Sequence, residues 1–347
     1  MKKPEASRQI SPQPERPTLR TVADASGLAI TTVSRALNNA SDIALGTRER
    51  VRQVADELGY IPNRAGRGLR TGRTHMLSLV LPPHAEITGY TASIISGLGE
   101  VCRDAGFELS ATPDVPHLDE LAVVKSIVQN HRADGIVLSR TSPQDLRVRY
   151  LIEKKFPFVT HGRTELASAH ASVDFDNELF AELAANRLAM RGRKRLMLVG
   201  VSSSLTYQAH LLNGFRRSVT RNGLDCVVPP EPLNLDMPLG RLRGIISTLF
   251  ASGNAPDGIV CAGDTATLAI MAGIHDAGLT PGIDAEVISK QTSATLDHVL
   301  PVIDSYFEDI ALTARQLGET LLQVIGGQVP LEQLTTIIPP EPRLRLG

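Results

Sequence analysis

The 347-residue sequence contains no tryptophan, and aromatic residues make up only 4% of it. Its hydrophobic cores must therefore be built mainly from aliphatic side chains. The three cysteines, Cys102, Cys226 and Cys261, lie far apart and form no CxxC pair. This spacing argues against a disulfide scaffold and against a zinc site.

Targeting and membrane segments are also missing from the pattern. Residues 1–17 carry charges and four prolines but lack the apolar stretch of a signal peptide. No uninterrupted apolar run approaches the ~18–20 residues that a membrane span needs. We therefore expect a cytoplasmic chain whose Pro-rich, polar residues 1–17 are disordered.

Signatures of catalysis are weak throughout the chain. The nine histidines are scattered, and neither an HExxH helix, a GxSxG elbow nor a GxxxxGK[ST] loop occurs. The glycine-rich run at residues 66–72 follows no predicted strand and has the wrong spacing for a dinucleotide fingerprint. The sequence predicts a protein that is not an enzyme and that uses neither a cofactor nor a metal ion.

The formal net charge of −1 hides a division between two regions. Residues 1–73 hold 13 Lys and Arg against 7 Asp and Glu, whereas the remainder holds 23 against 30. A basic segment of this kind is typical of contact with nucleic acid or another anionic surface, although a solvated tail has the same composition. The charge pattern indicates a basic module joined to a weakly acidic body.

The basic segment also has the periodicity of three short helices. Thr18 is a plausible N-cap, Gly27 suits a tight turn, and Gly59 suits the end of the third helix. The predicted helices cover residues 19–25, residues 30–38 and a stretch that begins after Thr47. Two short helices around a glycine turn, with a third that buries them, predict a helix-turn-helix domain at residues 18–62. A generic three-helix packing unit is the structural alternative.

The second predicted helix has side chains suited to reading DNA. Ile30, Thr31 and Thr32 occupy its first turn, the part of a recognition helix that meets base edges in the major groove. Their methyl groups suit the thymine methyl, and the threonine hydroxyls suit phosphates or base edges. Arg35 lies about one turn further on and could bond guanine.

Four sequence stretches follow one another in the basic segment: V-A-x-x-x-G, T-V-S-R-x-L-N, T-R-x-R-V and E-L-G-Y-x-P-N-R. In their order and spacing, residues 18–73 resemble the DNA-binding head of the lactose-repressor (LacI/GalR) family. The rest of the chain resembles that family's effector core, so the likeness covers about residues 18–345. One departure is Ala29, where the family commonly has a serine cap, a change that typically costs ~1 kcal/mol.

The resemblance implies a head that reads palindromic DNA, followed by a hinge helix at residues 63–74 that forms only on DNA. The leucine that wedges into the minor groove would be Leu69, and Arg67 belongs to a run of arginines at three-residue spacing that supplies charge for phosphates. A flexible basic linker is the alternative for this segment. The implied DNA-binding residues are Ile30, Thr31, Thr32, Ser34, Arg35, Asn38, Asn63, Arg67 and Leu69.

Short apolar runs alternate with amphipathic stretches after Thr74, which predicts parallel sheets covered by helices. We expect strands at residues 76–81, 107–112, 135–139, 156–160, 195–199, 224–228, 258–262 and 286–289. Two groups of strands indicate an α/β core at residues 75–345 made of two doubly wound parallel-sheet lobes. The family resemblance implies that these lobes are similar to those of a periplasmic sugar-binding protein, and that the chain crosses between the lobes three times. We assign the N-lobe to about 75–174 and 293–326, and the C-lobe to about 175–292 and 327–345.

Ligands of open α/β sheets bind at the carboxyl ends of the strands. Polar and aromatic side chains that follow the predicted strands could bond a polyol or sugar. Asp176 and Asp264 could instead be helix caps, and His210 an ordinary histidine. The effector-binding candidates are Tyr90, Arg140, His161, Arg163, Asp176, Tyr207, Asp264, Lys290 and Gln291.

The combined pattern predicts a homodimeric, sequence-specific transcriptional regulator, a repressor of carbohydrate uptake or catabolism genes that binds a palindromic double-stranded DNA operator. A small, sugar-like effector between the lobes would control it. A solute-binding receptor for sugar transport is the alternative function. Leu211, Gly263 and Gln291 depart from the family's effector-binding residues, while the S-K-Q and H-G-R stretches resemble a branch associated with sugar uptake, including α-glucosides.

Overall fold

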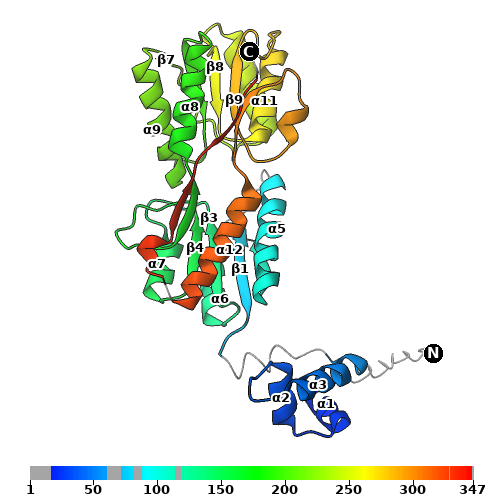
Figure 1. The fold of residues 1–347 in the computed structure, drawn as a ribbon. Coiled ribbons are helices and arrows are strands. Elements are labelled where there is room, and N and C mark those ends of the chain that lie inside the picture. Colours follow the sequence, from blue (N-terminus) through cyan, green and yellow to red (C-terminus); the bar gives the residue numbers. More distant parts are fainter. Residues whose placement is uncertain are drawn as a thin grey trace, which may run out of the picture. The chain divides into compact units, whose positions relative to one another are not determined.

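The computed structural model describes residues 17–60, 72–81, 88–113, 119, 121–327 and 329–345. The chain divides into two compact units, Met1–Thr74 and His75–Gly347 (Figure 1), and each is considered by itself. The predicted tail, up to residue 16, and the predicted hinge residues Asn63, Arg67 and Leu69 lie outside the described residues.

The first unit contains the three predicted helices, α1 (Leu19–Ser26), α2 (Ile30–Leu37) and α3 (Leu45–Glu57). Their shared core is small and aliphatic, as the composition predicts. It consists of the buried side chains Val22, Ala23, Val33, Ala36, Val51 and Ala55. The helix-turn-helix arrangement is confirmed.

The local signals at the helix ends act as predicted in three places. Thr18 caps α1 because its hydroxyl accepts the Thr21 N–H, while its own N–H donates to the Thr21 hydroxyl. Gly27 and Gly59 have φ of +69° and +65°, the left-handed region that favours glycine. Ala29 makes no side-chain cap at the start of α2.

The start of α3 differs from the prediction. We expected the helix to begin after Thr47, but it begins at Leu45, with Ala44 in the cap position. The Ala44 carbonyl accepts both the Thr47 and the Arg48 N–H and so closes the first turn. Backbone bonding therefore starts the helix without a side-chain cap, a signal that the sequence does not display.

The second unit contains two six-stranded sheets, which define its two lobes. The N-lobe sheet has the order β11-β5-β4-β3-β1-β2, and the C-lobe sheet has the order β12-β10-β9-β8-β6-β7. The pairing is parallel throughout except between β10 and β12. The N-lobe strands are β1 Met76–Leu81, β2 Glu108–Pro113, β3 Gly135–Ser139, β4 Phe158–His161, β5 Ser172–Phe175 and β11 Thr335–Ile338. The C-lobe strands are β6 Arg195–Val199, β7 Asp225–Cys226, β8 Gly258–Cys261, β9 Glu286–Gln291, β10 Asp304–Phe307 and β12 Glu341–Arg343.

Helices cover both faces of each sheet, because successive side chains of a strand point to opposite faces. In the N-lobe, Leu77 and Leu79 of β1 share a core with α5 and α12, which lie side by side in Figure 1. The N-lobe helices are α5 Thr88–Ala105, α6 Ala122–Gln129, α7 Leu146–Glu153 and α12 Ile310–Gly326. The C-lobe helices are α8 Asn177–Met190, α9 Thr206–Arg221, α10 Leu239–Ala251 and α11 Asp264–Asp276.

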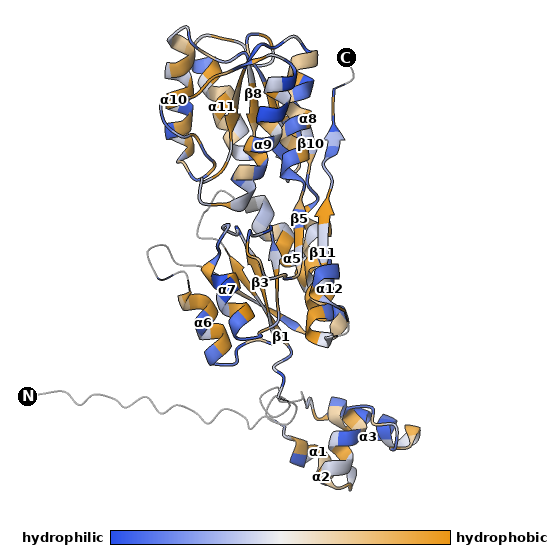
Figure 2. Cartoon of the chain, turned by 90° about the vertical axis from the view of Figure 1, so that its left-hand side faces the viewer, coloured by the Kyte–Doolittle hydropathy of each residue, from blue (hydrophilic) through white to orange (hydrophobic). Residues whose placement is uncertain are grey.

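Buried strands carry the apolar residues that hold the layers together. Most strands of both sheets are orange in Figure 2, and the helices between them and the surface have mixed colouring. Met197 and Val199 of β6 pack with α10 and α11, whereas Leu196 packs with α8 and α9. No helix within the described ranges combines the length and apolarity needed to cross a membrane.

The chain crosses between the lobes three times, but two of the expected boundaries were wrong. Residues 304–307 form β10 of the C-lobe sheet, so the second crossing comes at Glu308 and not near residue 293. Residues 335–338 form β11 of the N-lobe sheet, so the third crossing follows Ile338 and not residue 327. Both errors have one cause, since β10 and β11 are short strands that the hydrophobic pattern did not reveal.

Two buried carboxylates fasten the segment after β12 to the C-lobe. The Arg345 N–H and guanidinium donate to Asp304 at 2.7 and 3.1 Å. Asp304 also accepts from Arg187 of α8 at 2.9 Å. Glu286 forms ion pairs with Arg191, Arg193 and the same Arg345. These contacts join β9, β10 and α8 to the segment that enters the C-lobe last.

Candidate functional site

The recognition helix α2 presents most of its predicted DNA-binding side chains to solvent. Ile30 is 45% exposed although it is apolar, while Thr31, Arg35 and Asn38 are also exposed. Thr32 and Ser34 are half-buried. Val33 and Ala36 turn inward to the core. The helix therefore separates its packing face from a polar face that carries one exposed isoleucine.

Two of these polar side chains have partners within the head. Arg35 forms an ion pair with Asp42, and both side chains are more than half exposed. The Asn38 side-chain amide donates to the Ser34 carbonyl at 2.6 Å, at the end of α2. Arg50 of α3 donates to the Ser26 carbonyl at 3.1 Å and so joins α3 to α1.

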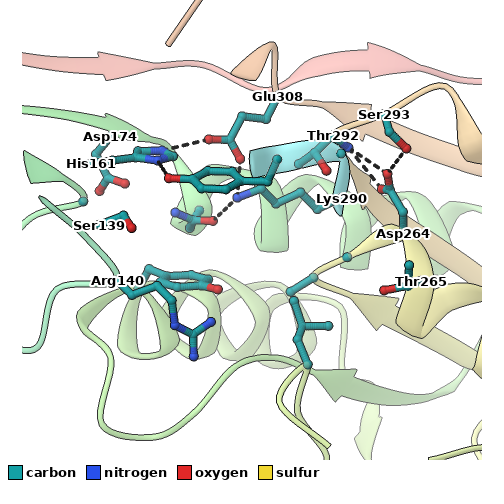
Figure 3. Close-up of a pocket in the computed structure, with 18 of the residues that line it drawn as sticks. Ser139, Arg140, His161, Asp174, Asp264, Thr265, Lys290, Thr292, Ser293 and Glu308 are labelled. Carbon is teal, nitrogen blue, oxygen red and sulfur yellow. Dashed lines mark hydrogen bonds and ion pairs between the residues drawn. The ribbon is translucent and has the colours of Figure 1, made fainter. Parts of the chain in front are cut away.

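A cavity of about 370 Å³ lies in the second unit, and residues of both lobes line it. The register of β3 and β4 sets Ser139 beside His161, the last residues of these strands. The N-lobe sheet contributes Ser139, Arg140, His161 and Asp174 (Figure 3), and α5 contributes Tyr90. The C-lobe contributes Asn177, Tyr207, Leu235, Asp236, Gly263, Asp264, Thr265, Lys290, Thr292 and Ser293.

An ion pair joins the two lobes at the cavity wall. Arg140 follows β3, and its Nη2 lies 2.8 and 2.7 Å from the two carboxylate oxygens of Asp236 in the C-lobe. Arg140 has a φ of +54°, an uncommon value for a residue with a side chain. A backbone hydrogen bond from the Thr206 N–H to the Thr141 carbonyl, 2.9 Å, also connects the lobes.

A second buried pair lies where the chain crosses between the lobes. Lys290 Nζ is 2.5 Å from Glu308 Oε2 and donates to the Asn177 side-chain carbonyl at 3.1 Å. The ammonium group also lies over the ring of Phe175, 4.4 Å from its centre. Burial by itself raises the pKa of Glu308, but Lys290 and His161 outweigh that effect and hold it at about 2. Glu308 is therefore a fixed negative charge at neutral pH.

Tyr90 and His161 extend this network along the cavity wall, and Figure 3 marks the contact between His161 and Glu308 with a dashed line. Tyr90 Oη lies 2.9 Å from His161 Nδ1, and His161 Nε2 lies 3.1 Å from Glu308 Oε1. A neutral imidazole satisfies both contacts if Tyr90 donates to Nδ1 and Nε2–H donates to Glu308. Burial raises the pKa of Tyr90 well above its ordinary value, so its hydroxyl stays protonated.

Asp264 begins α11 but does not cap it. We considered Asp264 a helix cap, whereas Gly263 occupies the cap position. The carboxylate instead accepts the Thr292 N–H at 3.1 Å and the Ser293 hydroxyl at 2.6 Å. Burial raises the pKa of Asp264. Asp176, in contrast, does cap α8, because its side chain accepts the Leu179 N–H at 2.9 Å.

The structure brings together six of the nine effector-binding candidates. The cavity is lined by Tyr90, Arg140, His161, Tyr207, Asp264 and Lys290. Three candidates are not among its lining residues: Asp176 is the cap just described, Arg163 forms an ion pair with Asp174 at 2.7 Å, and Gln291 bonds Ser293, Asp297 and Ser305. Gln291 does not line the cavity, although its neighbour Lys290 does. Strand β9 extends through both residues, so their side chains point to opposite faces of the sheet.

Several lining residues were not among the candidates. Asp236 lies in a loop between β7 and α10, Glu308 lies between β10 and α12, and Asn177 is the first residue of α8. His210, expected to be an ordinary histidine, accepts from Arg163 at 3.2 Å. In the part of the chain that the structure describes, no group of three or more His, Cys, Asp or Glu is placed to hold a metal ion.

Comparison with known proteins supports both units. The family of bacterial regulatory proteins named lacI matches residues 18–63, and a periplasmic binding protein-like domain matches residues 185–346. The HTH-type transcriptional regulator AglR of Rhizobium meliloti (strain 1021) is 28% identical over 301 residues, 85% of this chain and 82% of that protein. RafR of Escherichia coli, another HTH-type transcriptional regulator, is 26% identical and covers 90% of this chain and 93% of its own length.

Solved structures share the fold. A lac repressor dimer bound to operator and the anti-inducer ONPF has a TM-score of 0.81 at 21% identity, over 94% of this chain and 98% of that one. A complex of the transcriptional regulator CelR with cellobiose has a TM-score of 0.70 at 23% identity, over 95% and 99%. The head thus matches the lacI family of bacterial regulatory proteins and the two-lobed core matches a periplasmic binding protein-like domain, so the chain is a DNA-binding transcriptional regulator of the kind to which AglR and RafR belong.

Proposed function

We propose that this regulator represses genes of carbohydrate uptake or catabolism, and that a sugar-like effector in the cavity between the lobes controls its binding to DNA. The observation that carries the proposal is the cavity of about 370 Å³, lined by both lobes of a chain that also has a DNA-reading head. Small-molecule sites typically measure about 300–1,000 Å³. The complex of CelR with cellobiose supports a sugar as the class of effector.

The lining of the cavity suits a molecule with many hydroxyl groups. Carboxylates and carbonyls accept hydrogen bonds from hydroxyls, whereas Arg140 has guanidinium N–H groups that donate to them. Tyr90 and Tyr207 add ring surface for the less polar faces of a sugar. We assign effector binding to Tyr90, Arg140, His161, Tyr207, Asp264 and Lys290, and indirect support to Arg163, Asp176 and Gln291.

On the DNA side, we propose that Ile30 and Thr31 meet base edges and that Arg35 bonds a base or a phosphate. Thr32, Ser34 and Asn38 would bond phosphates. The exposure of Ile30, Thr31 and Arg35 on one helix supports these assignments. Asn63, Arg67 and Leu69 keep their proposed roles in a hinge that touches the minor groove, with a homodimer placing two heads on two half-sites.

An effector that contacts both lobes can alter how the lobes close. A ligand shifts an equilibrium between two conformations only by its difference in affinity for them. Because Arg140 and Asp236 come from different lobes, a ligand at this wall would favour one closure over the other. The lobe that follows the hinge would then transmit that preference to the heads.

The test begins by selecting an operator from a randomised DNA pool with the full-length protein. Operator affinity is then measured by fluorescence anisotropy with and without a panel of neutral saccharides. We expect at least one sugar to change the affinity by about 5–150-fold, the usual range of such coupling. Enrichment of no DNA sequence, with sugar binding retained, would favour the solute receptor. A selected operator that responds to no saccharide would refute sugar control.

A further inference from the structure

Among the charged side chains that line the cavity, carboxylates outnumber cations. Two cations line it, Arg140 and Lys290, against four carboxylates, Asp174, Asp236, Asp264 and Glu308. Arg163 pairs with Asp174 from outside the lining. Even with Arg163 included, the carboxylates exceed the cations by one. An anionic ligand would therefore enter a cavity whose own charge opposes it.

Each lining cation already has a carboxylate partner. Asp236 holds the guanidinium of Arg140 through both carboxylate oxygens, and the two side chains are only 20% and 17% exposed. Glu308 pairs with Lys290 through one carboxylate oxygen, in a still more buried position, while its other oxygen lies 3.1 Å from His161 Nε2. Recognition of a phosphate or carboxylate normally uses charge-assisted bonds from arginine or lysine. In this cavity, a carboxylate of the protein already binds each of the two cations, in the place that the anionic group of a ligand would take.

The start of α11 is the third place where an anion could be held, because the N-terminus of a helix attracts negative charge. Gly263, Asp264 and Thr265 at this end line the cavity. Asp264 places its own carboxylate at this end of α11, so a negative charge of the protein already occupies the position near the helix N-terminus that an anionic ligand would take. The hydrogen bonds that this carboxylate accepts come from neutral donors, Thr292 N–H and the Ser293 hydroxyl.

We propose that Asp236 sets the ligand selectivity of the cavity: by holding Arg140 across the two lobes, it makes the site accept uncharged saccharides and reject sugars that carry phosphate or carboxylate. The proposal rests on the sugar-controlled function argued above and narrows the class of effector. A neutral sugar leaves both ion pairs intact. Its hydroxyl groups can donate to the lone pairs that the carboxylates still have free, and they can accept from N–H groups of the cations that the ion pairs do not use. A sugar phosphate would have to displace Asp236 from Arg140 or remain near uncompensated carboxylates.

The proposal makes a direct prediction for the unmodified protein. Binding is measured by isothermal titration calorimetry with pairs that each consist of a neutral sugar and its anionic derivative. The pairs are glucose and glucose 6-phosphate, trehalose and trehalose 6-phosphate, sucrose and sucrose 6-phosphate, and glucose and glucuronate. We expect the neutral member of at least one pair to bind at least about tenfold more tightly than its anionic twin, because like charges in an enclosed site cost much affinity. An anionic twin that binds as tightly as its neutral partner, or more tightly, overturns the selectivity.

Two variants assign that selectivity to Asp236. D236N keeps the side-chain shape, removes the negative charge and leaves Arg140 able to meet an anion, so we expect it to bind a phosphorylated twin at least about tenfold more tightly than wild type does. The double variant R140Q/D236N removes both charges. It should lose that gain, which separates a released Arg140 from a general loss of negative charge. D276N is the matched control, because Asp276 carries the same charge on the outer end of α11, paired with Arg243.

The outcomes are distinguishable. D236N without a gain in anion binding, or with a gain that the double variant keeps, refutes the role of Asp236 while sugar control stands. If D276N gains the same affinity for the phosphorylated sugar, then the gain comes from the change in net charge, and the specific role of Asp236 is refuted as well. If no saccharide of either kind binds or alters operator affinity, sugar control itself fails and the selectivity with it. Thermal melting of each variant checks folding, and the wild-type comparison remains decisive if D236N does not fold.

Discussion

The head and the cavity each contain an ion pair at their functional face, and the two pairs differ in burial. Arg35 and Asp42 of the head have side chains that are 56% and 51% exposed. Lys290 and Glu308 of the cavity have side chains that are 10% and 2% exposed. Water screens the first pair, so Arg35 can exchange Asp42 for a DNA phosphate or base at little cost. The second pair cannot be separated without leaving an unpaired charge in a buried position.

The largest expected effect tests the buried pair. Glu308→Gln removes the carboxylate that Lys290 needs and should lower the free energy of unfolding by about 3–5 kcal/mol, the usual cost of breaking a buried pair. Urea unfolding followed by circular dichroism measures it. E231Q is the control, because Glu231 pairs with Arg241 on the surface and its loss should cost at most about 1 kcal/mol. Equal losses in the two variants would contradict the comparison.

Acid should weaken the same pair. The pKa of Glu308 is about 2 in the folded protein, against an ordinary value of 4.5. Its contribution to stability is therefore fully present above about pH 4.5 and is lost as the pH falls from there toward 2. The difference in unfolding free energy between wild type and E308Q should shrink over this window, by an amount on the order of 3 kcal/mol. A difference that stays constant from pH 7 to 3 would refute the depressed pKa.

On the exposed side, Arg35→Ala should leave the melting temperature unchanged and weaken operator binding by about 1–3 kcal/mol. The reason is that Arg35 bonds DNA and contributes little to the head's core. Gel shifts at moderate salt measure the effect, with Arg221→Ala of the C-lobe surface as the matched control. A midpoint that R35A shares with wild type would remove Arg35 from the DNA-binding face.

The smallest effect concerns the partner of Arg35. Asp42→Asn removes an exposed carboxylate from the recognition face and should tighten DNA binding by at most about 1 kcal/mol, with no change in stability. Asp24→Asn, an exposed site on α1, carries the same charge change in the same head. If D24N tightens binding as much as D42N, then Asp42 acts only through net charge. A large loss of affinity in D42N would show instead that Asp42 holds Arg35 in its binding position.

Much of this architecture could be read from the sequence, because local signals and tertiary structure agree there. Thr18, Gly27 and Gly59 mark the helix ends of the head, and β1, β3 and β6 have the predicted bounds. The strands that were missed have polar residues inside them. Asp174 lies in β5 and Asp304 in β10, and each carboxylate is compensated by an arginine from another segment, Arg163 and Arg187 respectively. Such compensation cannot be inferred from local hydrophobicity.

The cavity was predicted less completely for a related reason. Residues at the ends of predicted strands, such as Arg140 and His161, could be found because parallel strands bring their carboxyl ends together. Asp236 and Glu308 could not, since one lies in a loop and the other at a crossing between lobes. Their importance comes from the cations that they meet, Arg140 and Lys290, and those pairings exist only once the lobes are assembled.

The strands β11 and β12 have a consequence for how the chain folds during synthesis. Each completes the edge of a different sheet: β11 pairs with β5, and β12 pairs with β10 and is followed by Arg345, which bonds Asp304. A ribosome makes these strands after every other strand of both lobes. Until they emerge, β5 and β10 present open edges, a state that invites pairing with other chains. Both lobes therefore mature together, once β11 and β12 have been made, and a nascent chain depends on these two strands to protect both sheets.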